Sequence, residues 1–259
     1  MQAGFTMEPH FGTRFVRPSP EDEHRNIQVL LAGASLELST RDPAEIDACA
    51  GLLEPGTAVY ISMPPGQTYH GTVALATRLR RAGFYPVPHV AARRIASRDA
   101  LDEYLARAVG EAGVDSALVI GGDSDRPSGP FDSSRTLLET GLFQRHGVVR
   151  IGVAGYPEGH PKIAATALET ALAAKKSLAR RTGLDLQVVT QFCFESEPVL
   201  VWAAWSPDSA AWPGDATACA IGYSSSTAGS VAGSRAHPNR PARSTMAPST
   251  AMIGEYRIP

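Results

Sequence analysis

Six side chains suited to acid–base or binding chemistry fall at or just past the ends of predicted strands: Glu37, His89, Asp123, Tyr156, His160 and Gln191. Glu37 is flanked by two leucines, so it either faces solvent at a strand end or lies in a cavity. In a cavity, desolvation would raise the pKa of the carboxyl and suit it to proton donation. The Gln191 amide can donate and accept at once, as the edge of a pyrimidinone-like ring requires, or it faces solvent on its strand. His89, taken alone, is more typical of a packing residue than of a ligand.

Two Gly-rich turns follow runs typical of buried strands. Gly121-Gly122-Asp123 is not a dinucleotide fingerprint, because no G-x-G-x-x-G follows a strand here. It indicates either a tight loop, in which Asp123 caps the next amides, or part of a site. Tyr156-Pro157-Glu158-Gly159-His160-Pro161 offers an aromatic ring, a carboxylate, an imidazole and a rigid entry to a helix that could meet a phosphate. The alternative for this loop is a structural role.

Strands that alternate with helices position these residues. The predicted strands are Gln28–Leu38, Ala58–Met63, Tyr85–Val90, Ala117–Gly121, Arg150–Gly155 and Gln187–Phe194. Helical patterns lie near 43–53, 70–83, 99–112, 134–146 and 162–182. Such alternation predicts right-handed βα units and a parallel sheet. The chain length is close to that of one α/β barrel of the (β/α)8 TIM-barrel type. If the sheet closes as such a barrel, the carboxyl ends of the strands meet at one mouth and bring the polar residues together.

The chain divides into three predicted parts. Residues 1–26 form an N-terminal arm, residues 27–205 hold six βα units, and residues 206–259 form a low-complexity tail in place of the last two units. The tail is rich in Ala, Ser, Pro, Gly and Thr, which indicates a disordered extension. Out-of-frame translation is the alternative, because all but three of the 24 Lys and Arg residues are arginine, as GC-rich coding DNA favours.

Composition limits the function classes. The 259 residues carry a net charge of −2, so there is no basic field for nucleic acid. No apolar run approaches the roughly 20 residues of a membrane span, and the polar start lacks the apolar core of a signal peptide. The three cysteines form no Cys-x-x-Cys or Cys/His cluster, so no metal site is predicted. We expect a cytoplasmic protein with reduced thiols.

These residues give the chain a resemblance to the methylenetetrahydrofolate reductases, flavin-dependent barrels of one-carbon and methionine metabolism. The resemblance covers about residues 27–205, in family order and roughly family spacing. It is carried by Ser35-Leu36-Glu37-Leu38, Pro88-His89, Gly122-Asp123, Ala154-Gly155-Tyr156-Pro157-Glu158-Gly159-His160-Pro161 and Thr190-Gln191-Phe192-Cys193-Phe194.

The resemblance implies FAD, reduced by NADH or NADPH, and a methylenetetrahydrofolate substrate, in a protein that could be a homo-oligomer. Glu37 would be the general acid that helps open the one-carbon bridge of the folate, and Asp123 would tune the flavin and the pterin. Gln191 and Phe192 would contact the folate. The residues implied at the FAD are Ser62, His89, Gly122, Asp123, Tyr156, His160, Glu169 and Lys176.

Three departures from the family pattern leave alternatives. Gly121 stands where the family often has Arg, the stretch Tyr60–Pro65 differs from the usual end of the second strand, and the last two βα units are unrecognisable. One alternative is an inactive or partner-dependent relative that binds folate or flavin with an incomplete barrel. The other is a pterin-dependent methyltransferase barrel, which would ignore FAD and nicotinamide.

Overall fold

The structure, a computed structural model, describes residues 51–190 and 196–205 without a break, together with 19–21, 24–25, 28, 34–39, 46 and 254–257. Six parallel strands follow one another in chain order across a single sheet, and a seventh strand pairs antiparallel with the sixth. They are β1 (Leu36–Ser39), β2 (Ala58–Ser62), β3 (Tyr85–Ala91), β4 (Ser116–Ile120), β5 (Arg150–Gly155), β6 (Asp185–Thr190) and β7 (Gly254–Arg257). The predicted α/β fold with a parallel sheet is confirmed, whereas β7 was not expected.

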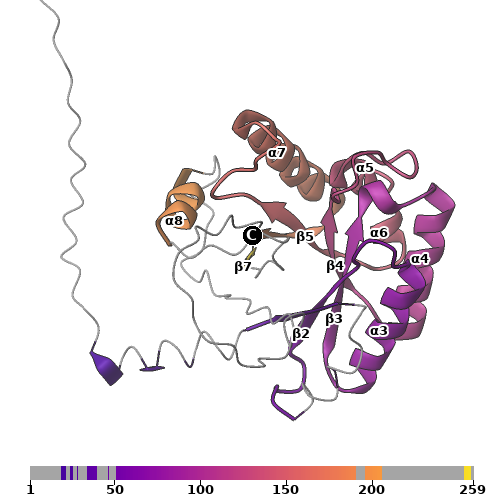
Figure 1. Cartoon of the computed structure of the whole chain (residues 1–259), viewed down its shortest axis with the longest axis horizontal. Helices are drawn as coiled ribbons and strands as arrows, with labels where there is room; N and C mark the ends of the chain where they lie inside the picture. Colours follow the sequence, from indigo (N-terminus) through magenta and orange to yellow (C-terminus); the bar gives the residue numbers. More distant parts are fainter. Residues whose placement is uncertain are drawn as a thin grey trace, which may run out of the picture.

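The helices that connect the strands lie together along one side of the sheet, from α3 to α7 (Figure 1). They are α3 (Tyr69–Arg81), the 3-10 turn η1 (Ala92–Arg94), α4 (Arg98–Ala112), α5 (Ser134–Leu138), α6 (Leu142–Arg145) and α7 (Ala165–Thr182), followed by α8 (Ser196–Trp205). Within the described residues, no helix has both the length and the apolar character that crossing a membrane requires.

Local capping explains where these helices begin and end. The side chain of Ser97 accepts a hydrogen bond of 3.0 Å from the amide of Ala100 at the start of α4. Gly113 and Gly183 end α4 and α7 in the left-handed conformation, as expected for glycine. The single helix expected over 134–146 is instead two short helices, because Gly141 adopts a φ of 71° between them.

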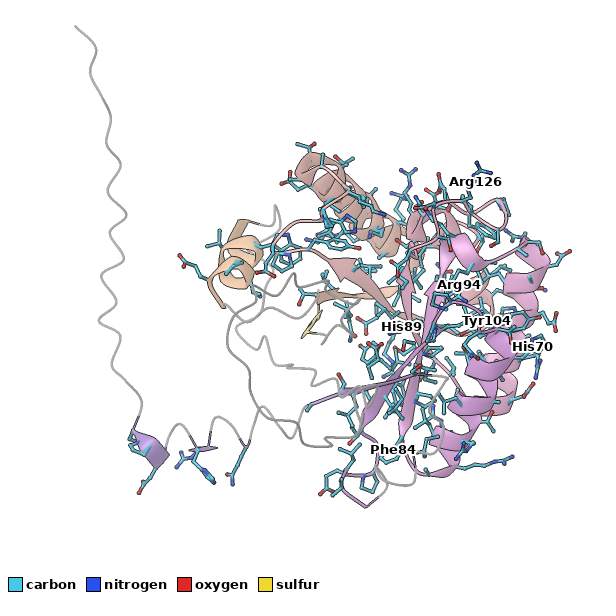
Figure 2. All side chains as sticks on the ribbon, in the orientation of Figure 1. His70, Phe84, His89, Arg94, Tyr104 and Arg126 are labelled. Carbon is cyan, nitrogen blue, oxygen red and sulfur yellow. The ribbon has the colours of Figure 1, made fainter. Side chains whose placement is uncertain are left out.

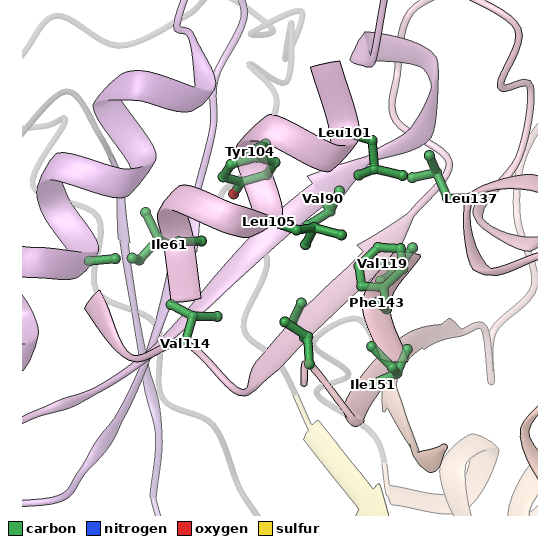
Figure 3. Close-up of a cluster of buried hydrophobic side chains, with 14 of the residues drawn as sticks. Ile61, Val90, Leu101, Tyr104, Leu105, Val114, Val119, Leu137, Phe143 and Ile151 are labelled. Atoms are coloured by element: carbon green, nitrogen blue, oxygen red, sulfur yellow. The ribbon is translucent and has the colours of Figure 1, made fainter. Parts of the chain in front are cut away.

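The core lies between the sheet and the helices. Alternate strand residues such as Ile61, Val119 and Ile151 pack against α4 residues such as Leu105 (Figure 3). Burying each such side chain stabilises the fold by about 1.5–3 kcal/mol. A second, smaller cluster occupies the opposite face of the sheet and consists of Tyr60, Val87, Leu118 and Val189. Glu37 and other polar strand residues point to this face, opposite the helices α3 to α7.

Candidate functional site

Glu37, Ser62 and His89 lie on the face of the sheet opposite the helices, beside Tyr60. Leu38 belongs to the helix-side core, so its neighbour Glu37 points to the other face, where it is in register with Tyr60. The rings of Tyr60 and His89 meet edge to face, with centroids 6.0 Å apart. Figure 2 shows His89 across the sheet from Tyr104 of α4. We call these four residues the strand-face group.

Burial shifts the pKa values of Glu37 and His89 in opposite directions. It raises the pKa of Glu37 to about 7, against a smaller lowering by a hydrogen bond from Ser62. The same desolvation lowers the pKa of His89 to about 4, so its imidazole is neutral at physiological pH. Nε2 of His89 is buried and has no hydrogen-bond partner among the described residues. The group therefore offers a carboxyl that can carry a proton at neutral pH and an imidazole nitrogen free for a ligand.

Gly122 and Asp123 follow β4 in a turn that only glycine allows. Gly122 has a φ of 90°, and a Cβ there would lie 3.2 Å from the Cβ of Ala91. The negative charge of Asp123 acts on two neighbours, raising the pKa of Tyr156 and that of Arg94. Burial is the larger influence in both, raising the pKa of Tyr156 further and lowering that of Arg94. Asp123 thus connects the end of β4 with the ends of β3 and β5.

The loop after β5 holds Tyr156 and His160 against each other. Their rings meet edge to face, with centroids 5.2 Å apart and an interplanar angle of 86°. The loop is closed by a hydrogen bond of 3.0 Å from the amide of Gly159 to the carbonyl of Tyr156. The amide of Lys162 donates to Nδ1 of His160 over 3.1 Å, so a neutral His160 carries its proton on Nε2.

A pocket of about 430 Å³ opens beside this loop, between the end of β5, one face of α7, and α8. Its size is that of a small-molecule site. It is lined by Ala154, Gly155, Tyr156, Pro157, Gly159, Ala165, Leu168, Glu169, Leu172, Ala173, Lys176, Arg180 and Trp202. We call it the β5 pocket. Lys176 and its neighbour Lys175 are both buried, with exposed fractions of 5% and 7%, yet only Lys176 lines the pocket.

The structure divides the predicted site residues between two places. Ser62, Glu37 and His89 share the strand-face group, whereas Tyr156, Glu169 and Lys176 share the β5 pocket, next to His160. Gly122 and Asp123 lie between them in the loop after β4. The predicted folate residues, Gln191 and Phe192, lie outside the described residues. Among the residues that are described, no group of three His, Cys, Asp or Glu side chains could hold a metal ion.

Sequence reasoning missed three residues that shape these two places. Tyr60 lies within a predicted strand. Because successive strand residues point to opposite faces, and Ile61 belongs to the helix-side core, Tyr60 could have been placed on the other face, with Glu37. Arg94 is the second of two arginines directly after a strand, a charged pair at the usual position of a site loop. Trp202 gave no such signal, because it lies in an apolar helix that was not predicted.

The chain matches no family model.

Proposed function

We propose that this protein is an FAD-dependent reductase that converts 5,10-methylenetetrahydrofolate to 5-methyltetrahydrofolate with NADH or NADPH as reductant. The observation that carries the proposal is the β5 pocket. Tyr156, Glu169 and Lys176 come from a strand end and from two turns of α7, and all three line the same hollow. These are residues that the family resemblance assigns to FAD.

The lining of the β5 pocket suits the nucleotide half of FAD. Its walls are mainly apolar, and Tyr156 and Trp202 supply ring faces for a purine. Lys176 and Arg180 supply cations for a diphosphate, and the carboxylate of Glu169 can accept hydrogen bonds from ribose hydroxyls. The unpartnered Nε2 of His89 is a polar atom that an isoalloxazine ring could satisfy. When bound, FAD would supply hydride transfer.

The strand-face group supplies the proton chemistry that folate reduction needs. A carboxyl with a pKa of about 7 holds a proton in a large fraction of molecules at neutral pH, so Glu37 can donate it to a nitrogen of the substrate. Ser62 favours the charged form of the carboxyl, against the larger effect of burial on its pKa. His89 stays neutral and therefore adds no charge beside the acid. Asp123 would adjust the electrostatics at the flavin from the neighbouring loop.

The strand order supports a barrel-type architecture for this reductase. Six parallel strands in unbroken sequential order, with their helices on one side, are typical of (β/α)8 barrels. Doubly wound sheets instead reverse their order and carry helices on both faces. We include in the proposal that the described sheet is six-eighths of such a barrel.

A second candidate function is favoured by β7. This strand pairs antiparallel with β6, where a complete barrel would have a seventh parallel strand. A chain with this arrangement could hold flavin or folate without turning substrate over. Such a binding protein would take up FAD but show no oxidation of NADH or NADPH.

The two neighbouring buried lysines of α7 allow a matched test of FAD binding. Lys176→Met should weaken FAD binding on the order of 10- to 100-fold, because losing one hydrogen bond to a charged group lowers affinity by about this factor. Lys175→Met removes an equally buried lysine outside the pocket and should leave the affinity unchanged. Flavin fluorescence titration of the full-length protein measures both. A wild type that takes up no FAD, or equal losses in the two variants, would contradict the proposal.

Anaerobic half-reactions separate the two candidate functions. Wild-type protein loaded with FAD is mixed with NADH or NADPH, and the flavin absorbance is followed; methylenetetrahydrofolate is then added. Bleaching followed by recovery of the absorbance supports the reductase. Bound flavin that neither nicotinamide bleaches supports the binding protein instead.

A further inference from the structure

Two adjacent arginines in η1, directly after β3, reach in different directions at the carboxyl end of the sheet. In Figure 2, Phe84 marks the end of the sheet where β3 begins, and Arg94 marks the opposite end, where β3 finishes. Arg126, which lies between β4 and α5, is at the same end as Arg94. The neighbouring connections are residues 63–68, between β2 and α3, and residues 121–133, between β4 and α5. The β2–α3 connection directly follows Ser62, and the β4–α5 connection contains Gly122 and Asp123.

Arg94 binds the β2–α3 connection through its guanidinium. It donates to the main-chain carbonyls of Met63, Pro64 and Gln67, the latter two over 3.0 Å each. A guanidinium has five N–H donors in a fixed planar fork, so one side chain can hold several carbonyls at once. A lysine ammonium keeps the charge but lacks the fork.

Arg93 binds the β4–α5 connection in a similar way. Its guanidinium donates to the carbonyl of Ser124 over 3.1 Å and to that of Asp132 over 3.0 Å. Its main chain adds a bond of 2.9 Å to the carbonyl of Gly121 and accepts one of 2.8 Å from the amide of Ser128. The two ends and the middle of this connection are thereby tied to the end of β3.

We propose that Arg93 and Arg94 are positioning residues that hold the two site connections in place. This holding role does not depend on the proposed function, because it concerns only contacts within this chain. Neither residue needs to touch substrate.

Hydrogen exchange on the full-length protein tests the holding role. Arg94→Met should speed exchange in residues 63–68 on the order of tenfold and leave residues 121–133 unchanged, and Arg93→Met should do the reverse. Arg98→Met, which removes a similar bond of 3.0 Å to the carbonyl of Thr140, should change neither connection. Unchanged exchange at the expected connection, or a global increase in both variants, overturns the holding role.

A second variant tests whether the planar fork of Arg94, rather than its charge, holds the β2–α3 connection. Arg94→Lys keeps the positive charge and should still exchange fast at residues 63–68. Exchange at the wild-type rate in Arg94→Lys overturns the holding role of the guanidinium. A wild type without FAD refutes the proposed function, while the holding role is decided by exchange alone.

Discussion

Glu37 and His89 share one face of the sheet, yet desolvation makes them affect stability in opposite ways as pH changes. Between about pH 4.5 and 7, the folded protein keeps a proton on Glu37 that the unfolded chain has released. The free energy of unfolding therefore falls as pH rises through this range. Between about pH 4 and 6.5, the unfolded chain protonates His89 and the folded protein does not, so the same free energy rises with pH. The two contributions oppose each other where the ranges overlap.

Single variants should uncover each contribution. Relative to wild type, Glu37→Gln should gain on the order of 1–3 kcal/mol in free energy of unfolding as pH rises from about 4.5 to 7, because its amide does not ionise. His89→Phe keeps an aromatic ring beside Tyr60 and should gain stability relative to wild type as pH falls from about 6.5 to 4. Urea unfolding at a series of pH values measures both. If the free energy of unfolding of each variant changes with pH as that of wild type does, Glu37 and His89 are not desolvated.

The same Glu37→Gln protein tests the proposed catalytic role of the carboxyl. In anaerobic half-reactions it should bind FAD and be reduced by NADH or NADPH as wild type is, because neither step needs this proton. The transfer to methylenetetrahydrofolate should be lost. Loss of flavin binding would instead show that Glu37 belongs to the flavin site and is not the acid.

At the scale of elements, α8 lies against β5 because β5 ends in glycine. A Cβ on Gly155 would come within 2.5 Å of a Val188 methyl carbon and 2.9 Å of the Trp202 ring. Gly155→Ala should therefore destabilise the protein by about 2 kcal/mol through overpacking. Gly121→Ala, at the end of the neighbouring β4, meets open space and should change stability by less than about 0.5 kcal/mol. Urea unfolding of the two variants compares them, and equal stabilities would show that α8 does not pack on β5.

The sequence predicted strands better than it predicted contacts between loops. The bounds of β5 were predicted correctly because a short apolar run between charges and glycine has few other uses. The break at Gly141 was missed, since one glycine in a helical pattern is usually tolerated. The bonds from Arg94 to three carbonyls follow no spacing rule, because they join residues about 30 positions apart. Similarly, four residues with the sequence Gly-Glu-Tyr-Arg are too few and too polar to predict β7.

For the whole molecule, β7 determines whether the sheet has a free edge at β6. Its four residues pair in register from Gln187 opposite Arg257 to Thr190 opposite Gly254. Without β7, the outer main-chain groups of β6 would have no strand partner among the described residues, and an unpaired edge readily pairs with other chains. In the sequence, β6 leads directly into the motif that the family resemblance assigns to folate.

Two truncations should separate the strand from the residues around it. A chain ending at Ile253 lacks β7 and should unfold at a lower temperature and associate into larger species, because β6 gains a free edge. A chain ending at Arg257 keeps the strand and should behave as the full-length protein does. Thermal unfolding and size-exclusion chromatography with light scattering measure the two effects. If both truncated chains stay as stable and as monodisperse as the full chain, the pairing of β7 with β6 contributes nothing to the fold, and the second candidate function loses its support.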